Sequence, residues 1–230
     1  MIYFTGDIHA DPQRFEAPEL KKLKSEDTLI VCGDFGFLWD GSTKEQRLLD
    51  KLAKKKYRIC FIDGTHENFD LLGSYPMVLF AGGKAHRIRK NIFHLMRGQI
   101  FGIEDKLIFT LGGGESPESA MKSDEELGTV RPEIPDRNEM LEGVRNLEKV
   151  NYEVDYIATH EPPAGIREFL LMNEDEIPAV SALGAYLSEL MTAATYDRWF
   201  FGSLHMDKFI SPKMVSVFQN VLDAETGNKL

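Results

Sequence analysis

Five short apolar runs are each followed, within a few residues, by an aspartate or a histidine, and this repeated arrangement most constrains the fold of the chain. The runs are rich in β-branched and aromatic residues, which is typical of buried strands. The polar residues that follow them are Asp7 and His9, Asp34, His66, His160, and His205. Because strand ends in a layered α/β protein gather at one edge, where ligands bind, the pattern predicts one site built from distant parts of the chain.

The order of the predicted elements indicates an α/β fold. Strands are predicted over Ile2–Thr5, Thr28–Val31, Arg58–Ile62, Ile92–Leu95, Leu107–Leu111, Val154–Thr159 and Arg198–Phe201. Helix-start signals at Ser42, Asp136 and Ser181 each precede apolar residues at helical spacing. Alternating strands and helices at both ends enclose consecutive strand-like runs, which favours mixed sheets in a single domain over residues 1–230. The polar stretch Glu115–Pro135 is predicted to be a loop beside the site.

Composition excludes several classes of function. With 27 Lys and Arg against 37 Asp and Glu, the net charge of −10 disfavours non-specific binding to nucleic acid, which requires basic residues to neutralise phosphates. No apolar stretch approaches the roughly 18 residues of a membrane span, and the first residues do not predict a signal peptide. The two cysteines, Cys32 and Cys60, lie in apolar runs and are interpreted as buried thiols. We therefore expect a cytoplasmic protein that does not bind membranes.

The polar residues after the strands form an ordered set of motifs. They read Asp7-Ile8-His9, Gly33-Asp34, Gly64-Thr65-His66-Glu67, His160, and Gly202-Ser203-Leu204-His205. This set resembles the calcineurin-like metallophosphoesterase superfamily, whose pattern is D-x-H, G-D, G-N-H-[DE], H and G-H-x-H. The segment after Gly64 is also similar to small bacterial and phage members. The resemblance implies a layered α/β/β/α sandwich, with two mixed β-sheets flanked by helices.

The resemblance also implies a pair of divalent metal ions. Asp7, His9, Asp34 and His205 match the ligands of the first ion. The second would be held by Asp34, His160 and two positions that the family fills with Asn and His, which are Thr65 and Ser203 here. Because hydroxyl groups are neutral and poor ligands for transition metals, we expect one firmly bound ion and a second that is weak or absent. Manganese is the foremost candidate, with iron, zinc, nickel or magnesium as alternatives.

The implied activity is hydrolysis of a phosphate mono- or diester, in a phosphorylated small molecule or a phosphoprotein, by a metal-activated water. His66 matches the family's acid, which serves the leaving group. Asn68 and Arg97 are further candidates for phosphate contacts, since Arg suits bidentate binding, although an ordinary surface role explains Arg97 equally well. The alternative function is a catalytically silent homologue that binds a phosphorylated ligand or a protein partner. A metal-dependent nuclease is disfavoured by the acidic charge.

Overall fold

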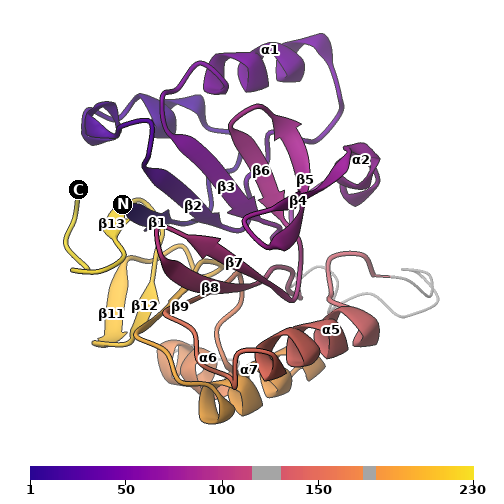
Figure 1. The fold of residues 1–230 in the computed structure, drawn as a ribbon, viewed down its shortest axis with the longest axis vertical. Helices are drawn as coiled ribbons and strands as arrows, with labels where there is room; N and C mark the ends of the chain where they lie inside the picture. The colour runs from indigo at the N-terminus through magenta and orange to yellow at the C-terminus, as the bar shows by residue number, and fades with distance from the viewer. Residues whose placement is uncertain (116–130, 173–179) are drawn as a thin grey trace.

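Two β-sheets packed face to face form the centre of the protein. The structure is a computed structural model that describes residues 1–115, 131–172 and 180–230. One sheet has seven strands and the other has six. Helix α1 (Thr43–Leu52) lies on the outer side of the first sheet, and the helices of the second half of the chain lie outside the second sheet (Figure 1). The predicted sandwich of two mixed sheets flanked by helices is therefore confirmed.

The seven-stranded sheet has the order β13-β1-β2-β3-β6-β5-β4. Its strands are β1 (Ile2–Thr5), β2 (Thr28–Cys32), β3 (Arg58–Ile62), β4 (Met77–Phe80), β5 (Gly83–Arg89), β6 (Ile92–Leu95) and β13 (Leu222–Asp223). Strands β1, β2, β3 and β6 run parallel, whereas β13, β5 and β4 pair antiparallel. The carboxyl ends of β1, β2 and β3 consequently meet at one edge.

The six-stranded sheet has the order β11-β12-β10-β9-β8-β7. Its strands are β7 (Gln99–Ile103), β8 (Lys106–Leu111), β9 (Tyr156–Thr159), β10 (Arg198–Phe201), β11 (Lys208–Ser211) and β12 (Met214–Ser216). The parallel run comprises β8, β9, β10 and β12. Each of the seven predicted strands is present, and β9 begins two residues later than predicted, at Tyr156.

Alternation along the strands divides the buried residues among three apolar layers. Phe4 and Ile30 point into the space between the sheets, whereas the neighbouring residues Tyr3 and Leu29 point outward beneath the helices. The two sheets meet directly where the ring of Phe4 stacks on that of Phe200, with centroids 4.0 Å apart. A third apolar cluster lies between the six-stranded sheet and helices α5 (Arg137–Glu148) and α7 (Ala182–Ala193). This packing fixes the strand ends of one sheet relative to those of the other.

The predicted helix starts are correct. The side chain of Ser42 accepts a hydrogen bond from the Glu45 N–H at the start of α1, and Asp136 forms a reciprocal capping box with Glu139. Ser181 caps the third predicted helix. The described helices after α1 are α2 (Phe69–Ser74), α5 (Arg137–Glu148), α6 (Ala164–Leu171) and α7 (Ala182–Ala193). Residues 116–130 of the predicted loop lie outside the described residues. In the part of the chain that is described, every helix is too short or too polar to cross a membrane.

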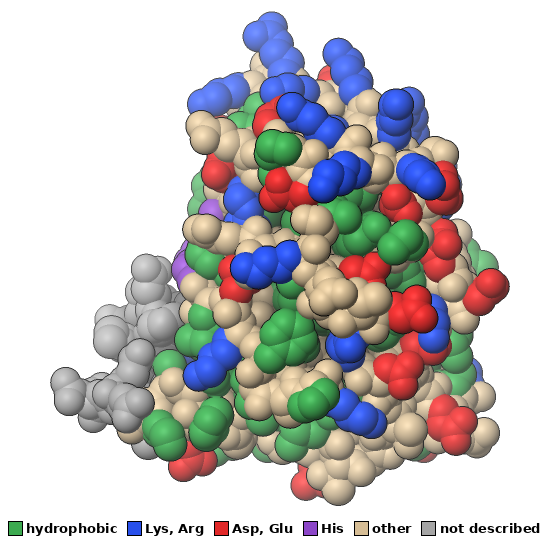
Figure 2. All heavy atoms as spheres, turned by 90° about the vertical axis from the view of Figure 1, so that its left-hand side faces the viewer, with side chains coloured by type: hydrophobic (Ala, Val, Ile, Leu, Met, Phe, Trp, Pro, Cys, Tyr) green, Lys and Arg blue, Asp and Glu red, His purple; other side chains and the backbone are tan. Residues whose placement is uncertain are grey.

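The surface charge is unevenly distributed. On the face shown in Figure 2, lysine and arginine side chains gather at the end of the molecule that carries α1, whereas acidic side chains are spread over the remainder. On this face, the basic residues are therefore concentrated near α1, although the net charge of the chain is −10.

Candidate metal centre

Five strands from two sheets deliver the predicted site residues to one place. Asp7 and His9 follow β1, Asp34 follows β2, and His66 follows β3, all in the seven-stranded sheet. His160 follows β9 and His205 follows β10 in the six-stranded sheet. The site therefore lies where the carboxyl ends of two parallel sets of strands meet.

Four of these side chains form a compact ligand cluster. Asp7, His9, Asp34 and His205 each offer one ligand atom, and these atoms all lie within 4.8 Å of one another. The Nε2 atoms of His9 and His205 are 3.0 Å apart. The two carboxylates are buried and the two imidazoles are exposed, so the cluster opens to solvent on its histidine side. The four side chains are those that the resemblance assigned to the first ion.

The environment of Asp7 fits a cation. Its side chain is fully buried, and neither carboxylate oxygen has a hydrogen-bond partner among the described residues. Burial raises the pKa of Asp7 to about 6, although the neighbouring His160 opposes this rise. A buried carboxylate without a partner is unfavourable unless a cation compensates it. Two carboxylates and two imidazoles also form a donor set that suits divalent transition metals.

Asp34 faces both sides of the site. Its Oδ2 atom lies 3.7 Å from Nε2 of His9, and its Oδ1 atom lies 3.9 Å from Nε2 of His160. Burial would raise the pKa of the carboxyl, but His160 and hydrogen bonds from His66 outweigh it, so the pKa of Asp34 is lowered. Asp34 thus lies between His9 and His160, and its role as a ligand shared between two ions stays a prediction.

His160 is oriented by the backbone. Its Nδ1–H donates to the carbonyl of Cys32 over 3.1 Å, and a carbonyl can only accept, so Nδ1 carries the proton. Nε2 faces Asp34, and in the neutral ring this nitrogen carries a lone pair that a metal ion could use. A backbone carbonyl that fixes the second ring nitrogen is the usual partner of a metal-binding histidine.

The remaining positions of the second site carry hydroxyl groups. Oγ of Thr65 lies 3.0 Å from Nδ1 of His66, and Ser203 is half-buried two residues before His205. Glu161, which follows His160, pairs with Arg167 and accepts the backbone N–H of Glu115 over 3.2 Å. Among the described residues, the one group of three or more acidic, histidine or cysteine side chains in ligand geometry is the four-residue cluster.

The backbone of the cluster adopts a conformation that non-glycine residues rarely populate. Asp7, His9, Asp34 and His205 have φ angles of 30°, 47°, 45° and 47°. Such angles are unfavourable by on the order of 1–3 kcal/mol each, and they concentrate at functional sites. The left-handed turns direct each side chain away from its strand axis and into the shared site.

At two positions beside the site, only glycine leaves enough space for a neighbouring side chain. A Cβ atom on Gly33 would lie 2.0 Å from Nδ1 of His160, and Gly33 has a φ of +98°. A Cβ atom on Gly64 would lie 2.0 Å from Oδ1 of Asp34. The glycines in the G-D and G-x-H motifs therefore provide space for the ligand side chains.

Two further residues support the site and were missed by sequence reasoning. The carboxylate of Glu67 is buried and accepts the backbone N–H of Phe35 over 2.7 Å, which holds the loop after Asp34. Arg14 donates to the carbonyls of Gly6 and Asp7 over 3.1 Å each, which holds the loop after β1. The motif position of Glu67 was a usable signal, whereas nothing in the local sequence distinguishes Arg14 from a surface arginine.

Comparison with known proteins agrees with this geometry. A family model described as calcineurin-like phosphoesterase matches residues 1–211. The chain belongs to this family. A search of curated proteins finds no match. Within this calcineurin-like phosphoesterase, the family match covers every residue of the ligand cluster.

The two candidate phosphate contacts are engaged within the protein. Arg97 is buried, and its guanidinium pairs with Asp63 at 2.6 Å and with Glu139 at 2.9 Å. Asn68 caps helix α2 by accepting the Leu71 N–H over 2.9 Å, and its amide donates to the Trp39 carbonyl over 2.6 Å. These contacts are structural, and a phosphate contact by either side chain stays a prediction.

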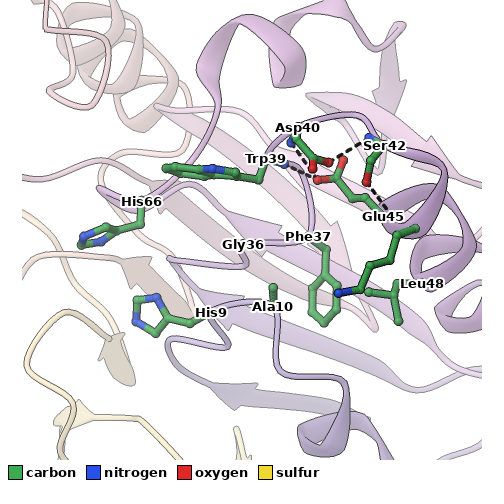
Figure 3. A pocket seen from close by; sticks show the side chains of 11 residues that line it. His9, Ala10, Gly36, Phe37, Trp39, Asp40, Ser42, Glu45, Leu48 and His66 are labelled. Carbon is green, nitrogen blue, oxygen red and sulfur yellow. Dashed lines mark hydrogen bonds between the residues drawn. The ribbon is translucent and has the colours of Figure 1, made fainter.

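A groove adjoins the cluster of the phosphoesterase. It has a volume of about 420 Å³, and His9 and His66 form the end nearest the ligands. Figure 3 shows these two imidazoles on one side, with the Trp39 indole beside His66 and with Phe37 and Leu48 further along. Bound substrate at the cluster would therefore have a mainly apolar space next to it.

Proposed function

We propose that the chain is a metal-dependent phosphoesterase that hydrolyses a phosphate mono- or diester. The observation that supports this most strongly is the convergence of Asp7, His9, Asp34 and His205 within 4.8 Å in a member of the calcineurin-like phosphoesterase family. The substrate would be a phosphorylated small molecule or a phosphoprotein. The buried free thiols of Cys32 and Cys60 support a reducing, cytoplasmic setting.

The four cluster residues would hold the firmly bound ion, with manganese as our first candidate. A divalent ion held there would supply positive charge near the phosphoryl oxygens and would make a water molecule a better nucleophile by lowering its pKa. His160, with its free Nε2 beside Asp34, would help to hold a weaker second ion. The buried Asp7 carboxylate has no hydrogen-bond partner among the described residues, so both of its oxygen atoms are available to a metal ion.

His66 would serve the leaving group. Its Nδ1–H donates to Oδ2 of Asp34 over 3.1 Å, and its backbone N–H donates to Oδ1 over 2.9 Å. Both contacts fix the ring beside the cluster, while the side chain remains 54% exposed toward the groove. Nε2 of the protonated ring can then donate a proton to the departing oxygen.

The proposal is tested by measuring metal content per chain together with turnover of 4-nitrophenyl phosphate in Mn²⁺, Mg²⁺, Zn²⁺, Ni²⁺ and Fe²⁺. We expect at least one ion per chain and turnover with at least one metal. Asp34→Asn is expected to lose both, because Asp34 faces both sides of the site. His66→Gln is expected to keep the metal and lower kcat by about 100-fold, in the usual range for a missing general acid.

A second candidate is a homologue that binds a phosphorylated ligand or a protein partner without hydrolysing it. The hydroxyl residues Thr65 and Ser203, at positions where the resemblance expects metal ligands, favour this alternative. One bound ion per chain without turnover in any metal would support it and overturn the enzymatic proposal.

A further inference from the structure

The exposed side chain of Trp39 is the strongest unexplained feature beside the cluster. The indole is 57% exposed, although tryptophan is among the side chains that gain most from burial. It lines the groove that His9 and His66 close at one end, and it also lines a second cavity of about 400 Å³ on the side of Asn68. The indole therefore stands between two hollows.

The backbone of Trp39 is held rigidly in spite of this exposure. Its N–H donates to Oε2 of Glu45 over 2.6 Å, and its carbonyl accepts the Asn68 amide over 2.6 Å. Glu45 is itself buried and also accepts the N–H groups of Asp40 and Gly41. These contacts fix the backbone from which the indole extends, so less conformational freedom is lost when a ligand binds to the ring.

The rest of the groove is suited to the same type of ligand. Its lining is apolar at Ala10, Phe37 and Leu48, while Lys44, Asp40 and Glu45 contribute charges of both signs. Apolar area therefore favours the organic part of a ligand more than its anionic group. Because His9 belongs both to the groove and to the ligand cluster, a phosphoester bound at the cluster would extend its organic part toward Trp39. Its volume of about 420 Å³ lies within the usual range for small-molecule sites.

We propose that Trp39 is a stacking surface for a planar aromatic ring in the organic part of the substrate, which makes aryl phosphates and nucleotides the substrate class. This inference rests on the proposed phosphoesterase function. An exposed indole can stack with many kinds of planar aromatic ring, because every such ring has a π-face. Asn68 is then a positioning residue, since its amide fixes the Trp39 carbonyl.

The test compares phenylphosphonate with methylphosphonate, which share the anionic group and contain a P–C bond that phosphoesterases do not hydrolyse. Binding to the Mn²⁺-loaded protein is measured by calorimetry. We expect phenylphosphonate to bind roughly 10-fold more tightly, as one stacked ring provides. This ratio should fall to about one in Trp39→Ala and persist in Trp39→Phe. Leu79→Ala, which removes another exposed apolar side chain on strand β4, is the matched control and should keep the ratio.

A second readout does not depend on metal-assisted turnover. The chain has two tryptophans, and Trp199 is fully buried, so a neutral aqueous quencher acts mainly on Trp39. Phenylphosphonate should protect the fluorescence from quenching, and methylphosphonate should not. Asn68→Asp keeps an acceptor for the Leu71 N–H but removes the donor to Trp39, so it should reduce this protection while the cap of α2 is retained.

The outcomes separate the two proposals. Equal affinities for the two phosphonates in the wild-type protein would overturn the role of Trp39 and leave the phosphoesterase proposal intact. A 10-fold preference that survives in Trp39→Ala would also overturn that role. Binding of neither phosphonate would also overturn the role of Trp39, whereas the phosphoesterase proposal is decided separately by turnover of 4-nitrophenyl phosphate. Two substrates then distinguish a nucleotide from a simple aryl phosphate. The kcat/KM of Trp39→Ala is measured for adenosine 5′-monophosphate and for phenyl phosphate, and the substrate that loses more indicates which class the groove binds.

Discussion

The Nε2 atoms of His9 and His205 lie 3.0 Å apart, although 196 positions separate the two residues in the chain. His9 follows β1 of the seven-stranded sheet, and His205 follows β10 of the six-stranded sheet. Their contact therefore depends on the packing of the two sheets, which the stacked rings of Phe4 and Phe200 fix. With Asp7 and Asp34 beside them, the two imidazoles form the ligand cluster on which the first prediction depends.

Replacing His205 is predicted to weaken metal binding. His205→Gln removes one of four ligands, so we expect affinity for Mn²⁺ to fall by at least about 100-fold, since even supporting residues around metal sites contribute about 10–100-fold. Calorimetric titration measures the change. His86→Gln removes a histidine outside the cluster and should leave the affinity unchanged. An unaltered affinity in His205→Gln would contradict the assignment.

Restoring the two ligands expected at the second site is predicted to increase metal content. Thr65→Asn combined with Ser203→His supplies an amide oxygen and an imidazole beside His160, whose Nε2 is free. We expect the stoichiometry to rise from about one to about two ions per chain, measured by elemental analysis after dialysis. Ser203 has a φ of 68°, so Ser203→Asn is a control for backbone strain without an imidazole. Unchanged stoichiometry in the double variant would contradict the proposed origin of the weak site.

Gly33→Ala is predicted to destabilise the protein and displace His160. The new Cβ would lie 2.0 Å from Nδ1 of His160 and would sit on a residue with a φ of +98°, so we expect a loss of about 3 kcal/mol or more. Gly73→Ala is the matched control, because a Cβ there meets nothing within 4 Å in helix α2. The control should gain about 0.5–1 kcal/mol. Urea denaturation measures both, and equal effects of the two substitutions would contradict the prediction.

Arg97→Met tests whether the arginine acts in structure or in substrate binding. Burial raises the pKa of Asp63, but Arg97 and His94 outweigh this effect and hold it well below its usual range. Removing one partner of a buried ion pair leaves the other charge uncompensated, so we expect a loss of about 3–5 kcal/mol in the free energy of unfolding. The KM for 4-nitrophenyl phosphate should stay within about twofold of wild type. The reverse result, a raised KM with unchanged stability, would favour a substrate contact.

The His86 ring is predicted to make stability depend on pH. Burial, together with the stacked His94, lowers the pKa of His86 to about 4; the Nδ1 atoms of the two rings are 3.1 Å apart. The unfolded chain then binds more protons between about pH 6.5 and pH 4, so stability falls as the pH decreases through this range. Because the ring is only half-buried, we expect a loss on the order of 1 kcal/mol at pH 5.

His86→Gln should flatten this dependence between pH 7 and pH 5, as measured by urea denaturation at each pH. The slope should persist in His66→Gln, whose ring is exposed in the site. A slope that is identical in His86→Gln and wild type would assign the effect to other groups.

Local sequence alone determined the strands and the positions of the site residues. Runs such as Ile2–Thr5 and Arg58–Ile62 consist mostly of consecutive apolar residues, which is typical of strands covered on both faces, and the structure has both with these bounds. The helix caps at Ser42, Asp136 and Ser181 were equally predictable, because a cap depends on contacts within three residues. The placement of Asp7 and Asp34 at one edge followed from the parallel order of their strands.

The roles that depend on contacts between distant segments were decided only by the tertiary structure. Arg97 was an ambiguous arginine until the fold placed it on Asp63 and Glu139, and Glu67 became a backbone acceptor only because the loop after Asp34 lies against it. Trp39 carried no signal in the sequence, since its exposure depends on the groove that two loops form around it. The positive φ angles of the ligands are likewise set by packing. Backbone preferences depend on nearby residues and can therefore be predicted from the sequence. The partner of a side chain depends on which distant segments lie beside it once the two sheets have packed together.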